Sequence, residues 1–434
     1  MHRIYTNMFT DPSEHRTDHA VCAFTLSDNQ ISPDVSETLD ISHDMTDQDI
    51  RDLRPALPVP LLMPDVVQQK TADFVRHFTG HVMYAVKCNP DHIFLDAIYQ
   101  AGVRHFDVAS IGEIRRISAR FPDAVQYFMH PIKAPEAIRE AYINHGVRAY
   151  VLDYDGELEK IRHETNDAPD LELIVRLAIP KKTEQRDVAT DFSSKFGAQF
   201  DQAVNLLKAC RPHCAILGVS FHVGTQCQDP DRYAQAVAYA ARVIEASGVV
   251  VETLDVGGGF PADLESATPL PPVQAFTQSI ADAVSANGLK HMHLLCEVGR
   301  GLVAGGGALI VRVEGRKDDL LYLNDGTYGG LFEAGGAIGL PYPAHLIRRE
   351  ERAFQGQVRA FRFAGPTCDS VDMMQGPFML PEDVQVGDWI RLDQLGAYGE
   401  VSRTDFNGFG AVQKIILRPQ NAAPAEADKT AVHA

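Results

Sequence analysis

The stretch HVMYAVKCN, residues 81–89, is the strongest single indication of the fold. Residues 82–86 form a short apolar run typical of a buried strand, and the pair Asn89-Pro90 ends it. Lys87 stands at the end of this strand, although lysine is rarely buried unless it is paired or used. Partial burial lowers the pKa of an amine and makes it a nucleophile toward aldehydes. A lysine that extends from a strand end into solvent is the other explanation of this stretch.

The composition is that of a globular protein of 434 residues, long enough for two domains. Its net charge of −18 disfavours nucleic acid and anionic membranes as partners and suits a small cationic substrate. Seven scattered cysteines indicate free thiols in a reducing compartment, and Cys210 and Cys214 lack a second ligand pair, so no metal site is expected. No apolar run approaches the roughly 20 residues that span a bilayer, and no secretory signal is visible, so we expect a cytoplasmic protein.

From residue 81 onward, short apolar runs alternate with amphipathic helical patterns, which predicts an α/β fold with a parallel (β/α)8 barrel. The expected strands cover residues 82–86, 105–108, 126–129, 149–152, 172–178, 215–221, 253–256 and 293–296. The chemistry of such a barrel lies at the carboxyl ends of its strands. We therefore expect the polar residues near these ends to meet at one mouth.

The residues near these strand ends are of unusual types: Lys87, Asp107, Arg176, His222, Gly257, Gly258, Gly259, Glu297 and Arg300. Each has an ordinary explanation, such as a packed histidine, a flexible turn or a surface ion pair. Taken together, these residues have a common chemical explanation. An imidazole stacks on a flat ring, a glycine run approaches a phosphate, a carboxylate keeps a pyridine nitrogen protonated and arginine holds phosphate. With the lysine, this set describes a site for pyridoxal 5'-phosphate.

After residue 304 the pattern changes to strands with a period of two residues, at 306–314, 320–324, 357–363 and 389–392. We therefore divide the chain into four parts: a partly disordered N-terminal arm (1–54), the barrel (55–304), an all-β domain (305–418) and a disordered tail (419–434). One candidate strand of the arm, residues 21–26, is expected to join the β domain.

A series of motifs runs along most of the chain in one order: YAVKCN (84–89), FDVAS (106–110), SKFGA (194–198), GVSFHVGTQC (218–227), LDVGGGFP (254–261), EVGR (297–300), NDGTYG (324–329), GPTCDSVD (365–372), VGDW (386–389), GAYG (396–399) and FNGF (406–409). This ordered set resembles the barrel-type pyridoxal-phosphate decarboxylases of ornithine, diaminopimelate and arginine, whose fold is shared with alanine racemase. Within that group the chain is most similar to the eukaryotic-type ornithine decarboxylases.

The resemblance implies a role for each matching residue. Lys87 would carry the cofactor, His222 would stack on its ring, and Glu297 would bind the ring nitrogen. Asp107 and Arg176 would lie near the ring and its hydroxyl side. The residues that would hold the phosphate are Thr225, Gly257, Gly258, Gly259, Arg300 and Tyr398.

The resemblance also implies a head-to-tail homodimer in which Cys368 and Asp369 enter the partner's barrel. The cysteine would reprotonate the substrate carbon after CO₂ leaves, and the aspartate would bind the distal amino group. The implied activity is that of a carboxy-lyase in polyamine biosynthesis, which converts L-ornithine to putrescine, with L-lysine as the second choice. Other diamino acids or polyamine precursors (diaminopimelate, arginine, carboxynorspermidine) and a non-catalytic regulatory relative are the alternatives.

One segment departs from the ornithine-type pattern. A Tyr-Asp-His sequence, whose aspartate helps to bind the distal amine, usually follows NDGxYG soon afterwards. Residues 329–343 read GGLFEAGGAIGLPYP instead, and we expect Glu333 to replace that aspartate as a substrate-binding residue.

Overall fold

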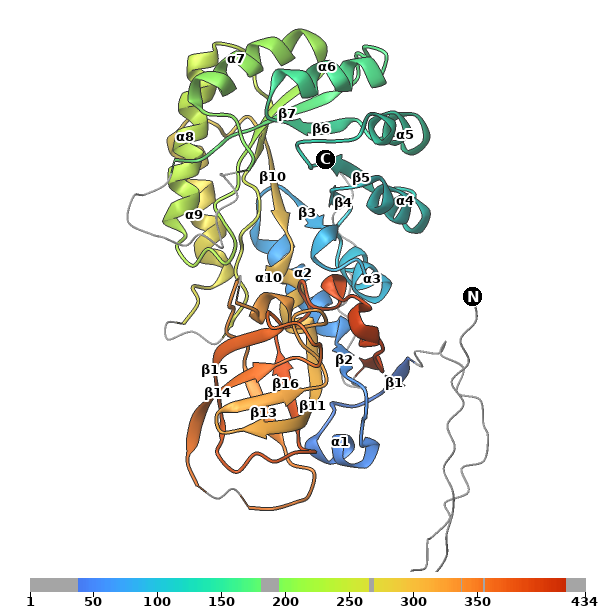
Figure 1. Cartoon of the computed structure of the whole chain (residues 1–434). Coiled ribbons are helices and arrows are strands. Elements are labelled where there is room, and N and C mark those ends of the chain that lie inside the picture. The colour runs from blue at the N-terminus through green and yellow to red at the C-terminus, as the bar shows by residue number, and fades with distance from the viewer. Residues whose placement is uncertain (1–37, 181–194, 265–268, 337, 354–355, 419–434) are drawn as a thin grey trace, which may run out of the picture. The chain divides into compact units, whose positions relative to one another are not determined.

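The computed structural model describes residues 38–180, 195–264, 269–336, 338–353 and 356–418. Eight parallel strands close into a barrel (Figure 1). They are β3 (His81–Ala85), β4 (His105–Val108), β5 (Val125–Phe128), β6 (Ala149–Leu152), β7 (Glu172–Arg176), β8 (Ile216–Ser220), β9 (Thr253–Asp255) and β10 (His293–Val298). Strand β10 pairs with β3 and completes the ring. The predicted parallel barrel followed by a β domain is confirmed.

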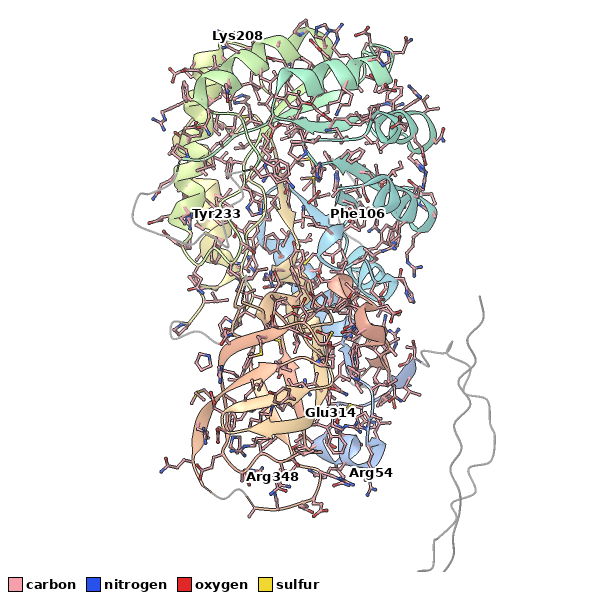
Figure 2. All side chains as sticks on the ribbon, in the orientation of Figure 1. Arg54, Phe106, Lys208, Tyr233, Glu314 and Arg348 are labelled. Carbon is pink, nitrogen blue, oxygen red and sulfur yellow. The ribbon has the colours of Figure 1, made fainter. Side chains whose placement is uncertain are left out.

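Helices alternate with the strands and cover the outside of the barrel (Figure 1). They are α2 (Pro64–His77), α3 (His92–Gln100), α4 (Ile111–Arg120), α5 (Pro135–His145), α6 (Asp155–Glu164), α7 (Phe200–Cys210), α8 (Asp231–Ser247), α9 (Val273–Ala286) and the short α10 (Arg300–Val303). Phe106 on β4 and Tyr233 on α8 are fully buried, whereas Lys208 on α7 is exposed (Figure 2). No helix in the described ranges is both long and apolar enough to cross a membrane.

The interior of the barrel is a packed apolar core. Its buried residues are Met83, Tyr127, Met129, Ala149, Val151, Ile174 and Leu295. Such filling is usual for eight-stranded barrels, whose interior is just wide enough for side chains. A ligand is therefore excluded from the middle of the barrel and must bind at its mouth.

A second sheet of nine strands forms the β domain. Its strands are β1 (Leu39–Ile41), β2 (Val59–Leu62), β11 (Gly307–Lys317), β12 (Leu320–Leu323), β13 (Ala344–Ile347), β14 (Val358–Ala364), β15 (Met373–Pro381), β16 (Trp389–Asp393) and β17 (Ile415–Leu417). A short helix, α1 (Asp47–Leu53), lies between β1 and β2 in sequence. The indole nitrogen of Trp389 donates a hydrogen bond to the Pro55 carbonyl (3.0 Å), which ties β16 to the start of the chain's described part.

The N-terminal boundary of the barrel differs from the one that we predicted. Strand β2 falls within the segment 55–304, but it pairs with β11 and β17 of the β domain. All four β2 residues are buried in that sheet, and the chain enters the barrel only with α2, which begins at Pro64. Strand β1 joins the same sheet by pairing with β17. The candidate strand at residues 21–26 and the tail at 419–434 lie outside the described residues.

A histidine at the amino end of the barrel makes stability depend on pH. His105, at the start of β4, stacks on His81 with ring centroids 4.2 Å apart, and its Nδ1 lies 3.1 Å from the Tyr127 hydroxyl. Burial, with a smaller contribution from His81, lowers the pKa of His105 from 6.5 to about 4. The unfolded chain therefore binds more protons than the folded one between these values, and stability falls as the pH falls through this window.

We predict that His105→Gln will make the free energy of unfolding less sensitive to pH between 7 and 5, because the titrating ring is gone. Urea denaturation at the two pH values measures the effect. His92→Gln, which changes an exposed histidine on α3, is the matched control and should keep the wild-type dependence. An unchanged pH dependence in His105→Gln would show that His105 does not titrate on unfolding.

Candidate active site

Lys87 lies in a short turn (Val86–Cys88) directly after β3, at the carboxyl mouth of the barrel. Its Nζ is 2.6 Å from Oδ2 of Asp107, which is buried at the end of β4. The lysine side chain is 44% exposed, so a ligand at the mouth can reach it. Burial alone would lower the pKa of Lys87, but the carboxylates of Asp107 and Glu297 raise it above its ordinary value. The expected lowering of this pKa was wrong, because the charges come from neighbouring strands.

Three carboxylates are buried at this mouth: Asp107, Asp255 and Glu297. Burial and the Glu297 carboxylate raise the pKa of Asp255, and burial and Asp107 raise the pKa of Glu297. Arg176, at the end of β7, acts in the opposite direction on Glu297. Oδ1 of Asp107 is buried without a hydrogen-bond partner. The cluster therefore favours a cationic group, because buried carboxylates are costly unless they are paired.

Asp255 belongs to the motif LDVGGGFP, but it was assigned no role from the sequence. Its position at the end of β9 could have pointed to the site, because β9 and β10 are parallel neighbours and their carboxyl ends lie together. Its Oδ1 accepts a hydrogen bond from the Gly257 amide (2.9 Å), which fixes the start of the glycine run.

His222 follows β8 and presents a neutral ring at the same mouth. Burial, and then the positive charges of Arg176 and Lys87, hold its pKa well below the ordinary value. Its Nδ1 accepts a hydrogen bond from the Gly224 amide (3.0 Å), which we take to place the proton on Nε2. A neutral imidazole fixed in this way is suited to stacking on an aromatic ring.

The glycine run after β9 packs directly against the His222 segment. At Gly257, φ is +67°, and an added Cβ would stand 1.9 Å from the Phe221 carbonyl oxygen. An added Cβ at Gly258 would lie 3.0 Å from Nε2 of His222. Both residues are buried, and only glycine fits both positions.

Arg300 begins α10 and is buried. Its Nη2 lies 2.6 Å from Oε1 of Glu333, whose Oε2 accepts a hydrogen bond from the Tyr342 hydroxyl (3.0 Å). Nε and Nη1 of the same guanidinium are buried without a hydrogen-bond partner. Sequence reasoning missed Tyr342, because its contact depends on how residues 329–343 fold back.

The β domain completes the site from the other side. The Tyr398 amide donates to the Cys88 carbonyl (2.9 Å), and the ring centroid of Tyr398 lies 5.0 Å from Cζ of Arg300. Asn89 donates through Nδ2 to the Gly396 carbonyl (2.8 Å). The turn that carries Lys87 is thus bonded on both sides to the segment that carries Tyr398.

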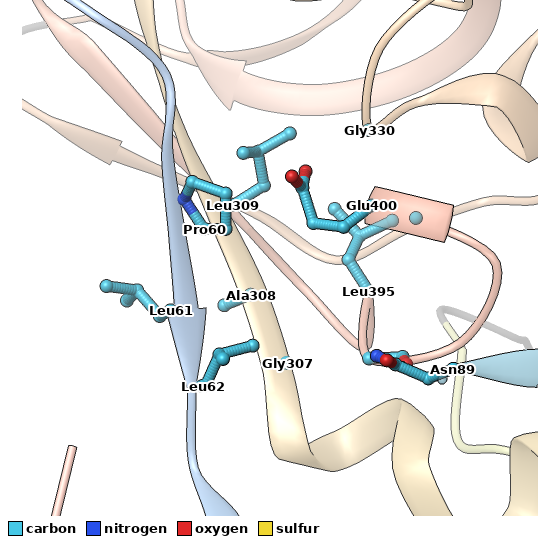
Figure 3. A pocket seen from close by; sticks show the side chains of 12 residues that line it. Pro60, Leu61, Leu62, Asn89, Gly307, Ala308, Leu309, Gly330, Leu395 and Glu400 are labelled. Atoms are coloured by element: carbon cyan, nitrogen blue, oxygen red, sulfur yellow. The ribbon is translucent and has the colours of Figure 1, made fainter. Parts of the chain in front are cut away.

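A small cavity beside Asn89 marks this junction (Figure 3). It lies among residues of β2, β11 and the segment 395–400, which includes Glu400. Its volume is about 10 Å³, room for roughly one water molecule at most. The cavity is therefore part of the packing between the two sheets and cannot hold a substrate.

Cys368 and Asp369 form a second cluster, in the loop between β14 and β15. Oδ2 of Asp369 accepts a hydrogen bond from the Tyr328 hydroxyl (2.5 Å), and the Cys368 amide donates to Oδ1 of Asn407 (3.1 Å). Cys368 is exposed. Thr225 lies in the loop after His222 and is half-buried. The structure thus brings the predicted cofactor residues to one mouth and places the predicted substrate residues on the β domain.

The fold and this group of residues define a barrel enzyme whose mouth suits an aldehyde cofactor that carries a phosphate. Comparison with known proteins agrees. Residues 65–304 match the family model described as "Pyridoxal-dependent decarboxylase, pyridoxal binding domain". Since the match covers more than half of the chain, the protein belongs to this family of pyridoxal-phosphate-dependent carboxy-lyases.

Individual relatives share the barrel and the β domain but differ in substrate. Lysine/ornithine decarboxylase of Selenomonas ruminantium is 28% identical over 87% of this chain and 94% of its own. Ornithine decarboxylase of Schizosaccharomyces pombe is 31% identical over 77% of each chain. The structure of Paramecium bursaria Chlorella virus arginine decarboxylase bound to agmatine covers 86% of this chain and 100% of its own, with a TM-score of 0.73 and 25% identity. The predicted family, enzyme class and cofactor are confirmed.

The residues at the mouth fit this cofactor. The buried carboxylates offer a partner to a protonated ring nitrogen, the neutral His222 offers a flat face, and the unpartnered donors of Arg300 offer a site for phosphate. The accessible amine of Lys87 is available to the aldehyde.

Proposed function

We propose that the protein decarboxylates a basic L-amino acid, with L-ornithine as the first candidate, giving putrescine, and L-lysine as the second. The observation that carries this proposal is the adjacent thiol and carboxylate of the exposed Cys368 and the half-buried Asp369, on the β domain of a chain with a full cofactor site. The thiol is a proton donor, and the carboxylate is a partner for a terminal ammonium group.

At the barrel mouth, Lys87 would hold the cofactor through its amine. His222 would support the ring, Glu297 would keep its nitrogen protonated, and Asp107 and Arg176 would set the charge around it. When bound, the cofactor supplies an acceptor for the electrons that the departing carboxylate leaves behind. The residues that would hold its phosphate are Thr225, Gly257, Gly258, Gly259, Arg300 and Tyr398.

Cys368 gives a proton to the carbon that has lost CO₂, and Asp369 binds the distal ammonium group of the substrate. A carboxylate left without its partner penalises substrates that lack this amine, by about 1–3 kcal/mol. This selection favours ornithine and lysine over neutral amino acids.

We further propose that the active enzyme is a homodimer in which these two residues enter the partner's barrel. Their surroundings support an interface. Apolar side chains are exposed close to them in sequence or contact: Val371 is 64% exposed, and Phe406, whose ring lies 4.6 Å from that of Tyr328, is 41% exposed. A hollow of about 430 Å³ beside Asp369 opens on the same part of the β domain.

Decarboxylation of another diamino acid or polyamine precursor is the second candidate, because residues 329–343 replace the Tyr-Asp-His segment of ornithine-type members. A non-catalytic relative is a third, and it predicts a damaged site. The ion-paired Lys87, the neutral His222 and the buried Glu297 argue against damage.

We predict that the purified enzyme will release CO₂ from L-ornithine or L-lysine in a panel that also contains L-arginine, meso-diaminopimelate and carboxynorspermidine. Cys368→Ala should slow release by about 100-fold or more, because it removes a proton donor. Asp369→Asn should lower kcat/KM about tenfold or more, because it removes the charge partner of the distal amine. Activity on another panel member alone would identify that compound as the substrate. Absence of CO₂ release from every panel member would contradict the proposal.

We predict that mixing inactive Lys87→Ala and Cys368→Ala proteins will restore about a quarter of the wild-type activity. Random exchange gives mixed dimers in about half of the population, and each mixed dimer regains one of two sites. Lys87→Ala mixed with a Lys87→Ala/Cys368→Ala double variant is the control and should stay inactive. A monomeric active enzyme, or mixing without any gain, would contradict the shared site.

A further inference from the structure

We propose that Glu333 is a positioning residue for the cofactor phosphate, acting through Arg300, and that it does not bind the substrate amine. This inference rests on the proposed role of Arg300 in phosphate binding. It assigns the segment 329–343, where this chain departs from ornithine-type members, to the cofactor rather than to the substrate.

Both carboxylate oxygens of Glu333 are already used. Oε1 lies 2.6 Å from Nη2 of Arg300, and Oε2 accepts from the Tyr342 hydroxyl at 3.0 Å. The ion pair is buried, with side chains 4% and 10% exposed. A substrate ammonium that sought Glu333 would have to break this pair inside the protein, where leaving one charge unpaired is strongly unfavourable.

The hydrogen bonds of Arg300 leave two of its three guanidinium nitrogens without a partner among the described residues. Nη2 donates a hydrogen bond to Glu333, while Nε and Nη1 are buried without a hydrogen-bond partner. Burial acts to lower the pKa of Arg300, and Glu333 raises it, so the arginine stays charged. An anion with several acceptor oxygens satisfies the remaining donors, and phosphate is such an anion.

The glycine-rich segment has a fold that delivers Glu333 to this place. Glu333 lies in a short turn (Phe332–Ala334), and its carbonyl accepts a hydrogen bond from the Leu340 amide (2.9 Å). The chain thereby returns toward Glu333 and brings in Tyr342, which is buried. The Tyr342 hydroxyl thus donates a hydrogen bond to Glu333, and Glu333 forms the ion pair with Arg300.

The test compares the binding of pyridoxal 5'-phosphate and of pyridoxal, which lacks the phosphate, to protein stripped of cofactor. We expect Glu333→Ala to raise the dissociation constant for pyridoxal phosphate about tenfold or more, as loss of an orienting contact does at other sites. Pyridoxal binding should change less than about threefold. Glu333→Gln keeps an acceptor for Nη2 and should stay close to wild type. Absorbance titration measures the dissociation constants of both ligands for wild type and for each variant.

Two further variants keep the test decisive. Tyr342→Phe removes one hydroxyl and should weaken pyridoxal-phosphate binding in the same selective way, by a smaller factor, even where Glu333→Ala folds poorly. Asp383→Ala removes a carboxylate from another arginine pair of the β domain, with Arg348 at 2.9 Å (Figure 2), and should leave both ligands' affinities unchanged.

Equal weakening of both ligands, unchanged binding, or tighter binding of pyridoxal phosphate in Glu333→Ala would overturn the positioning role. A raised KM for the amino-acid substrate at saturating cofactor would overturn it in favour of a substrate contact. Arg300→Met separates this inference from the proposed function. If that variant does not discriminate between the two ligands, the phosphate role of Arg300 itself fails. If it does discriminate and Glu333→Ala does not, only the role of Glu333 fails.

Discussion

Buried negative charge at the barrel mouth is the constraint on which the site depends. Asp107, Asp255 and Glu297 are all buried, at the ends of β4, β9 and β10, where carboxylates are costly unless they are paired with cations. Lys87 meets Asp107 directly, and Arg176 acts on Glu297. A protonated pyridine ring would supply further positive charge to these carboxylates. The same charges that hold the lysine in place thus prepare the mouth for the cofactor.

The second half of the site comes from the β domain, which closes over the turn that carries Lys87. Asn89 makes this contact through its side-chain amide and Tyr398 through its backbone amide, and both donate to backbone carbonyls on the other side. Arg300 lies between the last barrel strand and the β domain. Glu333, which belongs to the β domain, pairs with it. The proposed cofactor contacts of Arg300 and Tyr398 therefore depend on the arrangement of both sheets.

Local patterns predicted the barrel well, because each of its strands is visible in the sequence as an apolar run followed by a turn and a polar residue. The strands β1, β2, β13, β15 and β17 were missed, and so was α1, although Thr46 and Asp49 form a capping box that marks its start. The pair Arg300–Glu333 spans 33 positions in the sequence, and no local pattern links its members. The sign of the Lys87 pKa shift failed for the same reason, since its causes lie on other strands.

The most direct test of the account is to locate the residue that carries the cofactor. The holoenzyme is treated with sodium borohydride, which locks the cofactor to its lysine, then digested and analysed by mass spectrometry. The account predicts a phosphopyridoxyl group on Lys87, no stable adduct in Lys87→Ala, and a visible absorption band near roughly 420 nm that reduction removes. A cofactor adduct on any other lysine, such as the buried Lys133, would contradict it.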